Sequence, residues 1–312
     1  MKALKIGNIK LKNRLFLAPM VEVTDLPYRV LCRRQGAAIA YTEMIYVDAI
    51  LHENKKTLDM LRTSEEDKPI GIQVTGNNAG EFRKLSKLSL LRNFDLVDIN
   101  CGCPSSRIVG NEAGSYLLKT PDKIGEMIKI LKDSGLIVTA KIRLGFKNNN
   151  VMEVSKKINK AGADLLTIHA RTAEQRSSEP ADWKWISKVK NEIGIPVVGN
   201  GGIVDGKSAA VMLDIADGAM IAGAALGNPF VFREALRYLK TGKEKEVDYK
   251  EKIAAYLDYI NLAKKYGLTD LARVKFLGGH FLRGFWGASK ARWGLMGMKS
   301  VEDVVEFVGG IR

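Results

Sequence analysis

The chain has 312 residues, of which 46% are hydrophobic and 27% charged, a balance typical of a soluble globular protein with room for one barrel and an appendage. The N-terminus has no apolar signal core, no stretch approaches the ~20 apolar residues of a membrane span, and three cysteines are too few for a secreted disulfide framework, so we expect a cytoplasmic protein. The formal net charge of +14 favours a polyanionic partner.

Strand and helix patterns alternate regularly over the first 240 residues. Eight short apolar runs predict strands at 14–19, 38–43, 70–74, 94–99, 137–143, 165–169, 195–199 and 218–222. Helices are predicted from residue 27 and at 81–91, 121–132, 151–161, 183–192, 207–213 and 230–239. Eight strands apolar on both faces, separated by helices, predict an α/β fold of the (β/α)8 TIM-barrel type. A doubly wound sheet is the alternative, but it usually has fewer strands and a glycine-rich first turn.

The pattern changes after a charged linker at 241–246. Helical spacing is predicted at 249–265, 271–283 and 301–308, so we expect a barrel domain of residues 1–240 and a small all-helical domain of residues 241–312. Between residues 264 and 299 there are eight Lys or Arg against one Asp, interleaved with Phe and Trp. This composition predicts a nucleic-acid face, because aromatic rings stack on bases; a lysine-rich solubility surface is the alternative.

Polar residues follow the predicted strands at the end where a TIM barrel builds its site. Strand seven ends in Asn200, Gly201 and Gly202, and strand eight in Gly223 and Ala224. Such small turns let backbone N–H groups close around a phosphate. The other strand ends supply Ala18, Pro19, Met20, Gln73, Asn100, Cys103, Lys141, Arg143, His169 and Arg171. Cations, an imidazole, amides and a thiol above a phosphate site favour an electron-rich planar cofactor, and FMN fits this set.

Cys103 is the most informative of these residues. It follows a predicted buried strand, and Gly102 and Pro104 force a turn there, so its thiol is placed where α/β enzymes keep their chemistry. A small buried hydrophobe is the alternative interpretation. No metal site is expected, because Cys101 and Cys103 lack the further Cys or His residues that a tetrahedral set needs.

The chain resembles the tRNA-dihydrouridine synthase family over nearly its full length. The matching segments are 17–20 (LAPM), 73–76 (QVTG), 98–104 (DINCGCP), 113–115 (AGS), 141–145 (KIRLG), 169–172 (HART), 200–203 (NGGI) and 227–230 (GNPF). The resemblance implies a TIM barrel that binds FMN through Ala18, Pro19, Met20, Gln73, Lys141, His169, Asn200, Gly201, Gly202, Gly223 and Ala224. Cys103 would be the proton donor. Substrate contacts are expected from Asn100, Arg143 and Arg171 in the barrel, and from Arg273, Lys275 and Arg283 in the helical domain.

This resemblance also implies a reaction. One uridine of tRNA would be reduced to 5,6-dihydrouridine, with a hydride passing from FMN to C6 and a proton from Cys103 to C5. NADPH or NADH would be a transient reductant, because the chain lacks a Rossmann fingerprint. We expect a monomer that binds tRNA and no membrane. Two alternatives stay open: an FMN-dependent dihydropyrimidine or dihydroorotate dehydrogenase, and a non-catalytic RNA-binding protein.

Overall fold

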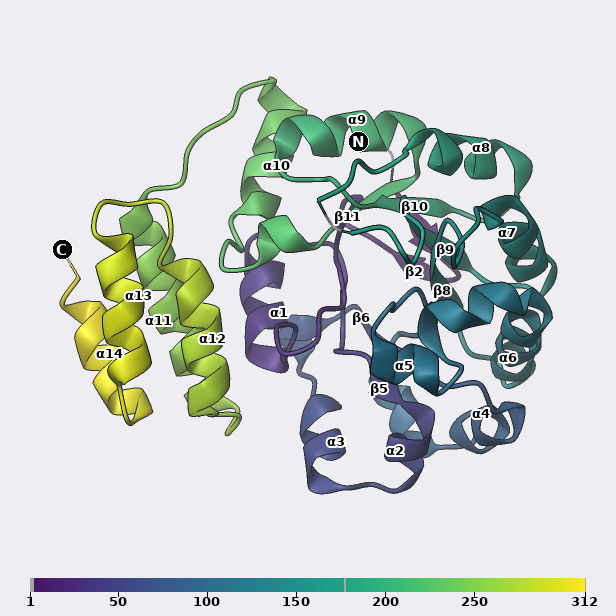
Figure 1. Cartoon of the computed structure of the whole chain (residues 1–312), viewed down its shortest axis with the longest axis horizontal. Helices are drawn as coiled ribbons and strands as arrows, with labels where there is room; N and C mark the ends of the chain where they lie inside the picture. Colours follow the sequence, from purple (N-terminus) through teal and green to yellow (C-terminus); the bar gives the residue numbers. More distant parts are fainter. Residues whose placement is uncertain (1–2, 177, 312) are drawn as a thin grey trace.

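A computed structural model describes residues 3–176 and 178–311 of the chain. Its centre is a parallel barrel of eight strands (Figure 1). In spatial order they are β3 (Leu15–Leu17), β11 (Gly218–Ile221), β10 (Val197–Asn200), β9 (Leu165–His169), β8 (Val138–Arg143), β7 (Leu96–Cys101), β6 (Ile70–Thr75) and β4 (Ala40–Tyr41). The barrel closes where Phe16 of β3 bridges Ile39 in parallel. The predicted TIM barrel is confirmed, and each of the eight strands overlaps its predicted range.

The barrel strands are buried on both faces, which explains their continuous apolar sequences. Every residue of β6 and β7 is buried. Side chains that point inward, such as Phe16, Leu96 and Val198, form one core inside the barrel, and outward-pointing ones pack under the helices. A hairpin of β1 (Lys5–Ile6) and β2 (Ile9–Lys10) adds Ile6 to the inner core. This hairpin was not predicted, because strands of two residues carry no recognisable period.

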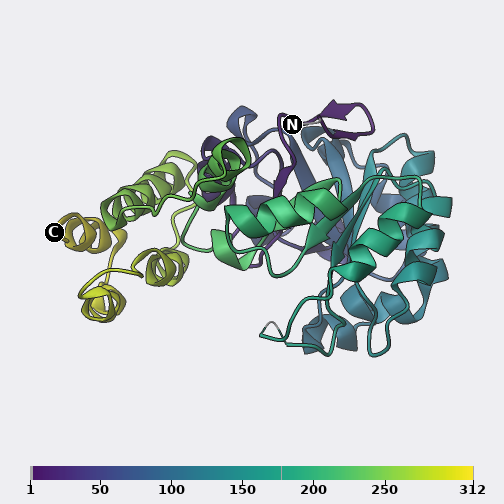
Figure 2. The ribbon, with the colours of Figure 1, turned by 90° about the horizontal axis from the view of Figure 1, so that it is seen from above.

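Helices surround the barrel, as Figures 1 and 2 show. The main ones are α1 (Leu26–Arg34), α4 (Ala79–Leu85), α6 (Pro121–Asp133), α7 (Val151–Lys160), α8 (Lys184–Glu192), α9 (Gly206–Ile215) and α10 (Val231–Thr241). Shorter elements lie in the connections: β5 (Ile45–Tyr46), α2 (Val47–Leu51), α3 (Lys55–Met60) and α5 (Ser106–Gly110). The helix predicted at 81–91 is shorter in the structure, where a 3₁₀ segment, Ser89–Asn93, replaces its last turns.

Four C-terminal helices pack together beside the barrel, on the side of α1 (Figure 1). They are α11 (Tyr249–Lys265), α12 (Leu271–Phe281), α13 (Ala288–Gly297) and α14 (Val301–Gly309). The ring of Tyr28 on α1 meets Tyr259 of α11 and Phe281 of α12 edge-on, each at a centroid distance of 6.1 Å. The hydrophobic core is therefore continuous from the barrel into these helices. No helix within the two described ranges is long and apolar enough to cross a membrane.

Candidate active site

The ends of the barrel strands enclose a pocket of about 230 Å³. Seven side chains that were predicted from strand ends line it together: Pro19, Gln73, Asn100, Cys103, Lys141, Arg143 and His169. Val21 and Met44 also line it and were not predicted. Val21 is 56% exposed although it is apolar. It directly follows the segment Ala18–Met20, which was predicted to line the site, and this adjacency is the sequence signal that could have identified it. The convergence of residues from six strands makes this pocket the candidate active site.

The turn that carries Cys103 is held by its own strand. The Oδ1 atom of Asn100 accepts the N–H groups of Gly102, at 3.0 Å, and of Cys103, at 2.9 Å. The backbone N–H of Ser115 donates to the carbonyl of Cys103 at 3.0 Å. Cys103 is half-buried, whereas Cys101 lies fully buried in the outer core, and burial raises the pKa of the Cys101 thiol far above its usual value. The two cysteines therefore differ in environment, and Cys103 alone borders the pocket.

A chain of hydrogen bonds beneath the pocket orients two amides. Asp98 accepts from Nε2 of Gln73 at 2.7 Å and from the hydroxyl of Thr139 at 2.6 Å. Gln73 then turns its Oε1 atom toward Asn100, whose Nδ2 donates to it at 2.9 Å. Burial raises the pKa of Asp98 to about 6, against the effect of its hydrogen bonds. The role of Asp98 was not predicted, although this residue begins the sequence motif that contains Asn100 and Cys103.

Lys141 is the central cation of the pocket. Its Nζ donates to Oδ1 of Asn200 at 3.1 Å, and Asn200 in turn donates to the carbonyl of Met220 at 2.8 Å. Burial and the positive charge of Arg143 lower the pKa of Lys141 to about 8. The ammonium group is therefore charged at neutral pH and can stabilise a negative charge that develops beside it.

Arg143 spans the gap between two loops. Its Nε donates to the carbonyl of Gly102 at 2.8 Å, and its Nη1 to the carbonyl of Thr172 at 2.9 Å. Burial lowers the pKa of its guanidinium somewhat. Because both carbonyls belong to loops at strand ends, Arg143 ties the turn of Cys103 to the loop after β9 while it lines the pocket.

His169 is a neutral imidazole in this site. Its Nε2 lies 3.1 Å from Nη1 of Arg171, and a guanidinium can only donate, so Nε2 accepts and the proton resides on Nδ1. Burial and the nearby cations Lys141, Arg143 and Arg171 lower the pKa of His169 to about 2. Arg171 itself is only 7% exposed and donates to the carbonyl of Glu179 at 2.6 Å. It therefore lies behind His169 and does not line the pocket; its contact with substrate stays a prediction.

The two glycines of the turn after β10 have conformations that only glycine adopts readily. Gly201 and Gly202 have φ of +97° and +77°, and a Cβ on Gly201 would overlap the His169 ring. Gly223 and Ala224 begin a 3₁₀ turn, Gly223–Ala225. Within the described ranges, the backbone N–H groups of these four residues donate to no protein acceptor. The turns can therefore donate to the oxygen atoms of a phosphate.

Ala18 and Met20, the remaining predicted residues of the segment after β3, form hydrogen bonds through their backbone N–H groups. Ala18 is buried, and its N–H donates to the carbonyl of Ile221 at 2.9 Å. The N–H of Met20 donates to the hydroxyl of Thr24 at 3.0 Å. These bonds hold the segment after β3 at the rim of the barrel, next to Pro19.

The predicted RNA-contacting residues of the helical part have different environments. Lys275 is half-buried and Arg283 is exposed, and each donates to a nearby carbonyl, Lys275 at 3.0 Å and Arg283 at 3.1 Å. Arg273 instead forms ion pairs with carboxylates of the barrel. Trp286 and Trp293 expose 99% and 81% of their surface. Large aromatic side chains are seldom left in water, so this surface has the character of an interaction site.

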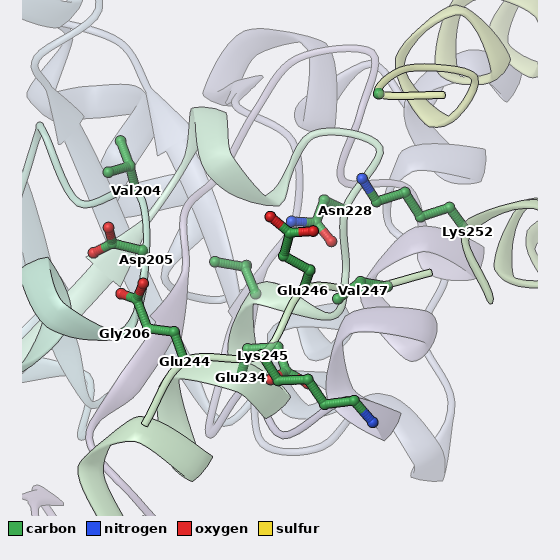
Figure 3. Close-up of a pocket in the computed structure, with 12 residues that line it drawn as sticks. Val204, Asp205, Gly206, Asn228, Glu234, Glu244, Lys245, Glu246, Val247 and Lys252 are labelled. Carbon is green, nitrogen blue, oxygen red and sulfur yellow. The ribbon is translucent and has the colours of Figure 1, made fainter. Parts of the chain in front are cut away.

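A second hollow, of about 400 Å³, lies where α9 and α10 meet the linker before α11 (Figure 3). Its lining includes four carboxylates, from Asp205, Glu234, Glu244 and Glu246, and two lysines. None of the predicted site residues lines it. Its acidic lining is unsuited to a phosphate or to RNA, so the Cys103 pocket remains the candidate active site.

Comparison with known proteins identifies the family of the chain. A family model described as "Dihydrouridine synthase (Dus)" matches residues 16–277. The probable tRNA-dihydrouridine synthase of Aquifex aeolicus (strain VF5) is 36% identical over 262 residues, which cover 82% of this chain and 81% of that protein. The tRNA-dihydrouridine synthase B of Pasteurella multocida (strain Pm70) is 34% identical over 235 residues, covering 74% of this chain and 71% of the relative.

Solved structures share the barrel. Histamine dehydrogenase from Rhizobium sp. 4-9 superposes with a TM-score of 0.59 at 16% identity, over 84% of this chain and 50% of that one. Morphinone reductase superposes with a TM-score of 0.54 at 10% identity, over 80% and 91% of the two chains. At these identities the likeness concerns the fold alone. The extent of the family match and the two sequence relatives confirm the predicted resemblance: the chain belongs to the dihydrouridine synthase family.

Proposed function

We propose that the protein reduces the C5=C6 bond of a uridine in tRNA to 5,6-dihydrouridine, with FMN as its cofactor and NADPH or NADH as the reductant. The observation that carries the proposal is the half-buried Cys103 thiol, which shares a pocket with Lys141, Arg143 and His169 in a chain of the dihydrouridine synthase family. A proton donor and cations in one pocket suit a reaction that adds a hydride and a proton to an enone.

The residues present fit FMN at two places. Four backbone N–H groups, on Gly201, Gly202, Gly223 and Ala224, have no acceptor among the described residues and can donate to its phosphate. The ring system would be held by the segment after β3 and by polar side chains of the pocket, which are Ala18, Pro19, Met20, Gln73, Lys141, His169 and Asn200. When bound, FMN supplies the hydride that reaches C6 of the uracil. Lys141 would then stabilise negative charge at the N1–C2=O edge of the ring.

The chain itself would handle the proton and the charge on the base. Cys103 donates its proton to C5, since its turn is fixed by Asn100 at the pocket wall. Arg143, anchored to the carbonyls of Gly102 and Thr172, can stabilise the charge that develops on the C4 carbonyl oxygen. His169 is neutral and holds its proton on Nδ1, so it acts as a hydrogen-bond donor there and not as a cation.

The helical part supplies a surface for tRNA. The net charge of +14 favours a polyanion, and the half-buried Lys275 together with the exposed Arg283, Trp286 and Trp293 combines cations with rings that can stack on bases. The target uridine must leave its stack to enter the Cys103 pocket. We infer that α12, α13 and the loop between them hold the tRNA while the barrel performs the reduction.

The test uses the full chain reconstituted with FMN and tRNA from a strain that lacks dihydrouridine. We expect NADPH-dependent formation of dihydrouridine at a defined position, measured by mass spectrometry of the digested tRNA. Reduction of free uracil, or oxidation of dihydroorotate, without any reaction on tRNA would indicate a small-molecule dehydrogenase. Binding of tRNA without flavin reduction by NADPH would indicate a non-catalytic RNA-binding protein.

A further inference from the structure

The segment between β3 and α1, residues 18–25, forms part of the wall of the active-site pocket through Pro19 and Val21. Its backbone turns at Glu22, which has a φ of +63°, a left-handed conformation that side-chain-bearing residues rarely adopt. The N–H of Glu22 donates to Oε2 of Glu43 at 2.6 Å. A carboxylate from the loop after β4 therefore holds this unfavourable turn in place.

The same segment has a second carboxylate at its end. Asp25 caps α1 by accepting the N–H of Tyr28 at 3.0 Å, and its other oxygen accepts the hydroxyl of Tyr259, on α11, at 2.9 Å. Asp25 and Glu43 are 8% and 3% exposed. Buried carboxylates need a cationic partner, because their charges are poorly solvated.

Arg273 of α12 supplies that partner to both. Its Nη1 lies 2.6 Å from Oε1 of Glu43 and 3.4 Å from Oδ2 of Asp25, and its side chain is 21% exposed. Two other ion pairs join the C-terminal helices to the rest of the described chain, Lys265–Glu66 and Arg233–Glu251. Both side chains of each pair are more than a third exposed, so these two pairs contribute little to the stability of the contact between the helices and the barrel.

We propose that Arg273 is a positioning residue for the reaction: from α12, it fixes the segment of residues 18–25 and thereby the pocket wall. This inference rests on the proposed function, and it gives the helical part a role beyond binding RNA. Arg273 was instead predicted from the sequence to contact tRNA directly. The two interpretations predict different losses, because a phosphate contact affects tRNA affinity and its salt dependence, whereas a positioning contact affects the pocket.

The test compares Arg273→Gln with Arg83→Gln, which makes the same change in an exposed pair with Glu126 on the outside of the barrel. Under the proposal, Arg273→Gln weakens FMN binding about tenfold or more and lowers kcat for uridine reduction by a similar factor. The KM for tRNA and its salt dependence stay within threefold of the parent value. Arg83→Gln changes none of these quantities.

The second arm works from the barrel side of the same contact. Glu43→Gln weakens FMN binding to a similar degree, and the double variant Arg273→Gln/Glu43→Gln is no worse than either single one, since all three break one link. Arg273→Lys keeps the positive charge but lacks the planar guanidinium group that can bond both carboxylates, so we expect an intermediate loss of FMN affinity. This variant takes the place of Arg273→Gln in the test if Arg273→Gln does not fold.

FMN titration by fluorescence separates this inference from the proposed function, because it needs no tRNA and no turnover. If FMN affinity and kcat are unchanged in Arg273→Gln while tRNA binding and its salt dependence fall, Arg273 is an RNA contact and the positioning role is wrong. Additive losses in the double variant would overturn it as well. If FMN binding responds as stated but uridine is not reduced by the parent enzyme, only the proposed function fails.

Discussion

Replacement of Cys103 by alanine tests the proposed proton donor. General acid catalysis by a positioned group contributes about 10²- to 10⁴-fold, which corresponds to roughly 3 to 5 kcal/mol of barrier at about 1.4 kcal/mol per tenfold. We expect dihydrouridine formation to fall by that factor. Because Cys103 is only half-buried, the loss of one sulfur atom should change the free energy of unfolding by less than about 1 kcal/mol. The defect should therefore appear in the chemical step and not in folding.

Cys101→Ala is the matched control, two residues away on the same motif. Cys101 is fully buried in the outer core, so its truncation should cost about 1 to 2 kcal/mol of stability and lower the Tm. Its rate of uridine reduction should stay within a few-fold of the parent rate, since it does not line the pocket. Cys103→Ser should be nearly as slow as Cys103→Ala, because an alcohol is a far weaker acid than a thiol.

The assay is a single turnover in which enzyme carrying reduced flavin is mixed with excess unmodified tRNA. Dihydrouridine is measured by mass spectrometry, and NADPH oxidation without tRNA reports whether the flavin site is intact. Cys103→Ala should oxidise NADPH normally. Equal losses of uridine reduction in the Cys101 and Cys103 variants, or a Cys103→Ala rate above a third of the parent rate, would refute the assignment.

Three further predictions concern the cofactor, the RNA surface and the junction of barrel and helices. Since burial and a neighbouring cation lower the pKa of Lys141 to about 8, its ammonium loses its proton as the pH rises through 8, so FMN affinity should fall above that pH. Lys141→Met should bind FMN weakly at every pH and lack this dependence in a fluorescence titration. Trp286→Ala and Trp293→Ala should each weaken tRNA binding by about 1 to 3 kcal/mol per stacked base, with FMN affinity unchanged; unaltered gel-shift affinity would assign these rings another role. Gly227→Ala should lower the Tm by several degrees, because Gly227 has a φ of +69° and an added Cβ would overlap the backbone of α12. Gly242→Ala, at a φ of +68° with open space around it, should cost much less, and equal shifts in Tm would contradict the overlap argument.

The sequence was sufficient to predict the elements whose residues repeat a local pattern. The barrel strands are apolar on both faces, so β6 and β7 could be located from composition alone. The helix Tyr249–Lys265 has the predicted bounds, because its apolar residues recur at helical spacing. Helix α13 was missed, since it contains Gly294 and exposes Trp293, and neither feature fits an amphipathic helix.

The position of the candidate site also followed from the sequence, because the carboxyl ends of parallel strands lie at the same end of the barrel whatever the conformation of the connecting loops. Which way each side chain points was decided by tertiary contacts. Arg171 lies behind His169, and Arg273 lies between two barrel carboxylates that are more than 200 residues away in the chain. Hydrogen-bond and ion-pair partners such as these are brought together only by folding. The sequence by itself therefore determined the barrel, the family and the residues at its mouth, whereas the tertiary structure decided which of them face the pocket and which hold others in place.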